Sequence, residues 1–177
     1  MKKIPRNNYV IAAIISILTF VIVGYFAFWY TETKEYSDDD AVMTGYLLEI
    51  GEESLIDNLS NYLLDNPNTV LYMTHDSNIV VKNFEEQFKQ FINDNNIKQS
   101  FIYIDLNKVE DKKFISEFKN NFFAEGLKNK NVEVEKQPNL FIFKEGKIQS
   151  ILYYTKQSIN MSDVKIFLEN EGIIEND

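Results

Sequence analysis

His75, Asp76 and Ser77 are consecutive residues whose types could form a hydrolytic relay of base, acid and nucleophile. They follow TVLYMT, a β-rich run, so they are expected where a strand ends. Neighbouring residues of a strand point to opposite faces, however, and no Gly-x-Ser-x-Gly turn is present to expose the serine. We therefore expect no relay, and we interpret His75 as a solvated or hydrogen-bonded loop residue.

Cysteine is absent from the 177 residues, and His75 is the single histidine. This composition excludes disulfides, thiolate nucleophiles, zinc–thiolate sites, iron–sulfur clusters and metal sites with several histidines. The run Asp38–Asp40 lacks the alternating ligands and the glycine turn of a calcium loop, so we interpret it as a solvated linker. The six glycines are scattered and form no phosphate-binding pattern. The sequence therefore predicts no catalytic residue, no metal and no cofactor.

Residues 9–30 contain no charged side chain and are predominantly apolar. A helix of these 22 residues would be about 33 Å long, enough to cross a hydrocarbon core of about 30 Å. A cleaved signal peptide has a shorter apolar stretch and a small-x-small exit, and a core helix is rarely apolar on every face. We therefore expect a single uncleaved transmembrane helix over residues 9–30.

The charges on the two sides of this segment differ in sign. Residues 1–8 contain three basic and no acidic side chains, whereas residues 31–177 contain 15 basic and 27 acidic ones. By the positive-inside rule, residues 1–8 lie in the cytoplasm and the bulk of the chain lies outside the cell membrane. We expect residues 31–43 to be an acidic linker and residues 44–177 to be an extracytoplasmic domain. Because an acidic domain is repelled by nucleic acid, no nucleic-acid partner is expected.

The domain alternates between the β and the helical hydrophobic period. Strands are expected at 46–50, 69–74, 101–106, 139–143 and 148–154. Helices are expected at 55–63, at 81–92, from 111 to about 126, and from 160 or 162 to 172. The residues between the last two strands, Lys144 to Lys147, are typical of a hairpin turn. This order predicts an α/β domain built on a mixed sheet with helices on both faces.

Two stretches of the domain resemble the thioredoxin-like family. QPNLFIFKEGKIQSILYY resembles the family's cis-proline, strand, turn and strand, with Pro138 in the position of the cis-proline. LEIGEESLIDNLSNYLLDNPNTVLYMTH resembles its opening strand, first helix and central strand. The resemblance extends over residues 45–172 and implies a thioredoxin-like mixed sheet. The overall plan is also similar to small membrane-anchored thioredoxin-like proteins of Gram-positive bacteria, some encoded with bacteriocin export systems.

The sequence departs from this family at the positions that carry its chemistry. Asn78 and Val81 stand where a redox-active member has its two cysteines, and Tyr72 stands where it has a buried acid. A thiolate is the attacking species in disulfide exchange, so this reaction is excluded and no enzyme is expected. What the resemblance still implies is binding, because the residue before the cis-proline presents backbone groups to an extended peptide. Here that residue is Gln137.

The predicted peptide- or partner-binding residues are Ser77, Asn78, Ile79, Gln137 and Pro138. The alternative is that Pro138 only shapes a turn and that the groove is vestigial. We therefore expect a non-catalytic, membrane-anchored accessory or binding protein that acts outside the cytoplasm on an exported or membrane protein or peptide. Two other functions remain open. One is a structural subunit assembled through the transmembrane helix at Ala12, Ala13 and Ser16, and the other is an immunity-type protein that binds a cationic toxin or bacteriocin.

Overall fold

The computed structural model describes residues 15–26, 42–51, 53–74, 79–128, 132, 134, 138–153 and 159–175. The chain divides into two compact units, Met1–Asp40 and Ala41–Asp177, and each is described by itself. The second unit includes Met43, whose side chain is fully buried, from the end of the segment predicted as a linker.

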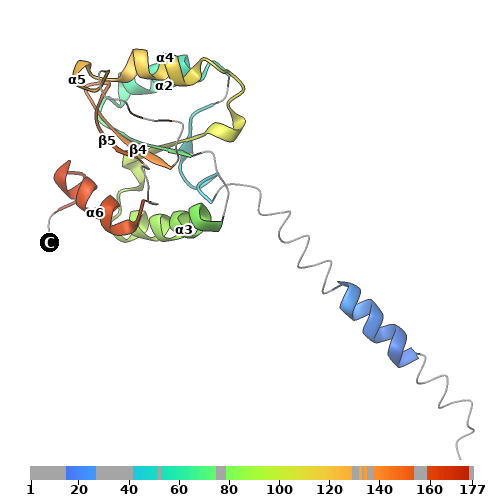
Figure 1. Ribbon diagram of the computed structural model, residues 1–177. Coiled ribbons are helices and arrows are strands. Elements are labelled where there is room, and N and C mark those ends of the chain that lie inside the picture. The colour runs from blue at the N-terminus through green and yellow to red at the C-terminus, as the bar shows by residue number, and fades with distance from the viewer. Residues whose placement is uncertain are drawn as a thin grey trace, which may run out of the picture. The chain divides into compact units, whose positions relative to one another are not determined.

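In the first unit, residues 15–26 form a helix (Figure 1). Its apolar side chains are exposed. Thr19 donates a hydrogen bond from its hydroxyl to the Ile15 carbonyl, 2.9 Å away. Within the described residues, no helix combines the length and the apolar character that crossing a membrane requires. The rest of the predicted transmembrane segment, residues 9–14 and 27–30, lies outside the described part of the chain.

The second unit is built on a five-stranded mixed sheet with the strand order β1-β3-β2-β4-β5. The strands are β1 (Leu48–Glu49), β2 (Val70–Thr74), β3 (Phe101–Asp105), β4 (Asn139–Lys144) and β5 (Lys147–Tyr153). β1, β3 and β2 are parallel, whereas β4 is antiparallel to both β2 and β5. The predicted mixed sheet is confirmed, although β1 is shorter than expected because residues 42–47 form turns.

Helices cover both faces of this sheet, as predicted (Figure 1). One face carries α2 (Leu55–Asp65), α4 (Phe114–Phe122) and the short α5 (Glu125–Lys128), and the other carries α3 (Ile79–Asp94) and α6 (Met161–Asn170). Each face has its own core cluster, so β2 and β3 are buried on both sides. Leu71 and Met73 of β2 point into the cluster of α2 and α4, whereas Val70 and Tyr72 point into the cluster of α3 and α6.

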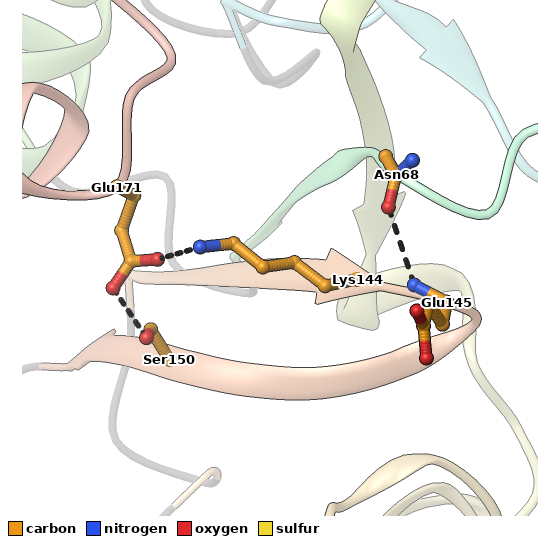
Figure 2. A network of polar contacts seen from close by, with 5 residues as sticks. All are labelled: Asn68, Lys144, Glu145, Ser150 and Glu171. Carbon is orange, nitrogen blue, oxygen red and sulfur yellow. Dashed lines mark hydrogen bonds and ion pairs between the residues drawn. The ribbon is translucent and has the colours of Figure 1, made fainter.

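The β4–β5 hairpin turns at Glu145 and Gly146, which both have positive φ, as a two-residue primed turn requires. Figure 2 shows how this hairpin is fixed to its surroundings. The Glu145 amide donates to Asn68 Oδ1 at 3.2 Å, in the loop before β2. At the end of α6, Glu171 accepts hydrogen bonds from Lys144 Nζ at 2.7 Å and from the Ser150 hydroxyl. These contacts hold β4 in place, and β4 begins at the predicted binding site.

Candidate binding face at the ends of the central strands

Two of the predicted binding residues, Ile79 and Pro138, belong to the edge of the sheet where β2 ends, α3 begins and β4 starts. Met73 of β2 pairs with Asn139 of β4, so the end of one strand lies beside the start of the other. Ile79 is the first residue of α3 and is 69% exposed, whereas Pro138 is buried immediately before β4. Ser77, Asn78 and Gln137 lie outside the described residues, as does the His75–Ser77 run.

The first turn of α3 presents apolar side chains to solvent at this edge. Ile79 is 69% exposed and Val80 is 57% exposed, whereas the next residue, Val81, is buried in the core. The helical period explains the change, because the buried side of α3 continues through Phe84, Phe88 and Ile92. The first two residues therefore belong to no part of the core that the structure describes.

A carboxyl group is buried on the core side of α3. Glu85 is 1% exposed, on the same side of α3 as Val81 and Phe88. The Tyr72 hydroxyl donates a hydrogen bond to Glu85 Oε1 at 2.8 Å, and the Val42 amide donates to Glu85 Oε2 at 3.1 Å. The Tyr72 side chain of β2 is thus paired with a carboxyl group that α3 supplies.

The surroundings of Glu85 favour its neutral form. Burial raises the pKa of Glu85 to about 7, and the negative charge of Asp105 also raises it. Hydrogen bonds from Tyr72 and Val42, together with the charge of Lys82, act in the opposite direction but are weaker than the effect of burial. Glu85 is therefore a buried group whose charge changes near neutral pH.

Aromatic side chains pack around Tyr72, which is the hydrogen-bond partner of this carboxyl group. The Tyr72 ring is stacked on Tyr103 at a centroid distance of 5.9 Å and meets Phe88 edge-on at 5.4 Å. Burial raises the pKa of both tyrosines far above their ordinary value, so both remain protonated. The Tyr103 hydroxyl faces the Thr44 hydroxyl. In the described part of the chain, neither the Tyr103 hydroxyl nor the Thr44 hydroxyl forms a hydrogen bond of standard geometry.

The start of β4 carries a second buried polar side chain. Asn139 is fully buried, and its Nδ2 donates to the Val134 carbonyl at 3.0 Å, while its Oδ1 has no hydrogen bond to the residues that the structure describes. Thr74, at the end of β2, is likewise buried. Glu85, Thr74 and Asn139 were not among the residues predicted from the sequence. A signal was available only for Glu85, which is an acid at a core position of an otherwise apolar helical face. Such an acid is rarely buried without a partner.

The face has no evident means of catalysis among the residues that can be placed. The sequence contains no cysteine, and the described residues contain no cluster of three or more His, Asp or Glu side chains that could hold a metal ion. At this edge, the described residues present two neighbouring exposed apolar side chains, Ile79 and Val80.

No family model and no curated protein matches the chain. Among solved structures, it is similar to thioredoxin O1 from Arabidopsis thaliana in its oxidized state, with 14% identity and a TM-score of 0.43 over 70% of this chain and 96% of the other. It is also similar to a protein described as a putative oxidoreductase with a thioredoxin fold, with 16% identity and a TM-score of 0.47 over 72% and 97% of the two chains.

Strand order, strand direction and the two helical layers make the second unit an α/β domain built on a mixed sheet, as the sequence predicted. At these identities and TM-scores the likeness to solved structures supports no argument about this chain. It carries no information about activity, substrate or partner, which must come from the residues of this chain.

Proposed function

We propose that this chain is a non-catalytic, thioredoxin-like binding protein, held at the outer face of a cell membrane by residues 9–30. Its partner is an exported or membrane protein or peptide. The observation that carries the proposal is the exposure of Ile79 and Val80 at the start of α3. In the alignment with the family, these two residues stand between the positions of the two missing thiols.

The energetics of this edge support binding. Burying a fully exposed Ile or Val side chain contributes about 1.5–3 kcal/mol, so two such residues can anchor a small interface. Pro138 lacks an amide hydrogen, and the backbone beside it, at Gln137, is proposed to pair with an extended segment of the partner. Ser77 and Asn78 are proposed to border the same surface. A membrane tether would raise the effective concentration of this face near membrane partners.

Replacing Ile79 and Val80 by aspartate is expected to reduce the amount of partner recovered with the full chain from its native membranes by at least about tenfold, because a buried charge at an interface is costly. The matched control is Ile166→Asp on α6, where an isoleucine is 53% exposed on another surface. The control should retain the partner, and unfolding of both variants should match wild type to within about 0.5 kcal/mol. Equal recovery with all three proteins would contradict the proposal.

The same assay separates the two alternatives. If the chain instead assembles through its apolar segment, at Ala12, Ala13 and Ser16, then exchanging residues 9–30 for an unrelated anchor abolishes recovery while the Ile79 variant does not. If the chain is an immunity-type binder of a cationic toxin, recovery of that toxin falls steeply with ionic strength. The proposed apolar contact predicts a weak dependence on salt.

A further inference from the structure

Residues 42–47, here called the strap, connect the first unit of the chain to β1. Met43 is fully buried and Leu47 is buried, and both side chains pack into the cluster between the sheet, α3 and α6. The amides of Tyr46 and Leu47 both donate to the Met43 carbonyl, at 3.1 and 3.2 Å, which closes a turn. The strap is therefore an ordered part of this core, although it is also the covalent link to residues 1–40.

Both ends of the strap form hydrogen bonds with α3. At its beginning, the Val42 amide donates to Glu85 Oε2 at 3.1 Å. Near its end, the Tyr46 hydroxyl donates to Asn93 Oδ1 at 2.7 Å and lies 3.3 Å from the Lys89 carbonyl. Glu85, Lys89 and Asn93 are spaced by four residues, so the strap lies along one stripe of the helix.

Only the first of these contacts involves a buried ionisable group. The ionisable side chains with the strongest influence on Glu85 are Tyr72 from β2, Asp105 from β3 and Lys82 from α3 itself. Tyr103 of β3 also interacts with Glu85, and α6 contributes the apolar side chains of Val164 and Leu168 to this cluster. The strap contributes its Val42 amide, which satisfies one carboxylate oxygen but does not offset the loss of water around the charge.

We propose that the strap is a latch controlled by the charge of Glu85: the neutral acid favours the docked strap, and the carboxylate favours its release. Release allows water to reach the buried charge, which the docked strap helps to exclude. It also adds six residues to the link between the two units, which increases the reach of the domain by up to about 20 Å. The latch does not depend on the proposed partner.

The direction of the pH effect follows from proton linkage. In the docked state the pKa of Glu85 is about 7, whereas a hydrated glutamate has a pKa of 4.5. The docked state therefore binds the proton more tightly, and acid favours docking. If release restores the hydrated value, the opening equilibrium increases about tenfold between pH 6 and pH 8.

Amide hydrogen exchange in the full chain, in detergent micelles, tests this latch. After correction for intrinsic exchange rates, the protection of residues 42–47 is expected to fall about tenfold between pH 6 and pH 8. In Glu85→Gln, which keeps the side-chain shape but cannot ionise, it should change less than twofold. In Tyr46→Phe, which weakens the other end of the strap, protection should be lower at both pH values with the same tenfold dependence.

Three results would overturn the latch. They are constant strap protection in wild type, an equal fall in Glu85→Gln, and strap protection equal to that of β2 and β3 at both pH values, which would indicate exchange through global unfolding. If Glu85→Gln fails to fold, the pH dependence of strap protection in the wild-type protein still tests the latch. Strap protection that falls with rising pH, levels off above about pH 7 and stays below the protection of β2 and β3 supports the latch, and any other profile rejects it.

Discussion

Phe118→Ala is expected to reduce the free energy of unfolding of the second unit by about 3–5 kcal/mol. Phe118 is fully buried, at the centre of the core between α4 and the sheet. Its ring lies within 5.2–6.1 Å, centroid to centroid, of Phe114, Phe122, Phe123 and Phe141. Removing it leaves a cavity that the four surrounding rings, two tilted and two edge-on, cannot fill without leaving their rotamers. The expected loss is a large part of the total stability of a domain.

Urea unfolding of the full chain, followed by circular dichroism, measures this loss. Phe118→Leu retains most of the buried volume and should lose clearly less than Phe118→Ala. Ile166→Ala, at an exposed position of α6, should remain within about 0.5 kcal/mol of wild type. A loss of less than about 1 kcal/mol for Phe118→Ala would mean that this aromatic core is not packed as described.

Tyr72→Phe is expected to destabilise the domain by about 1.5–3 kcal/mol at pH 8 and by less at pH 5.5. The substitution removes the hydroxyl that donates to Glu85 Oε1 at 2.8 Å. At pH 8 the lost bond is one to a charged group. At pH 5.5 Glu85 is largely protonated, because its pKa is about 7, so a weaker bond is lost.

The pH dependence has a defined sign. The pKa of folded Glu85 lies above 4.5, so the folded state binds this proton more tightly than the unfolded state. The stability contributed by the bound proton is complete below pH 4.5 and is lost as the pH rises through about 7. Because the hydrogen bond from Tyr72 lowers this pKa, Tyr72→Phe should raise it, and stability should then continue to fall at higher pH.

Tyr103→Phe is the matched control for Tyr72→Phe. Both tyrosines are fully buried and their rings are stacked on each other, but the Tyr103 hydroxyl has no hydrogen bond in the described part of the chain. Removing an unsatisfied buried hydroxyl should leave stability unchanged or slightly increased. Equal losses for the two variants, or a loss in Tyr72→Phe that does not vary with pH, would contradict the role assigned to the Tyr72–Glu85 contact.

Much of the fold could be predicted from hydrophobic periods, because β2 and β3 are continuous apolar runs buried on both faces. The boundaries that were wrong depend on tertiary contacts. The expected helix reaching residue 126 is interrupted at Phe123, whose extended backbone forms a bridge to Ile148. Local sequence contains no signal for that bridge.

The site could be predicted less well than the fold. Its predicted position follows from the resemblance around Pro138, whereas Ile79 was expected in a loop before a helix at 81–92 and is instead the first residue of α3. Glu85 was not singled out, because an acid among helical positions usually lies on the solvated side. Its partners are Tyr72, 13 residues away, and Val42, 43 residues away, and both contacts depend on packing that appears only in the folded chain.

Site-specific photo-crosslinking in living cells tests the proposed binding face most directly. A photoreactive residue in place of Ile79 reports on the exposed start of α3, and one in place of Lys165, on α6, is the control. If this face binds the partner, a discrete adduct forms from position 79 and none forms from position 165. Mass spectrometry of the adduct then identifies the partner. No adduct from a stably expressed protein, or equal adducts from both positions, would contradict a binding role for this face.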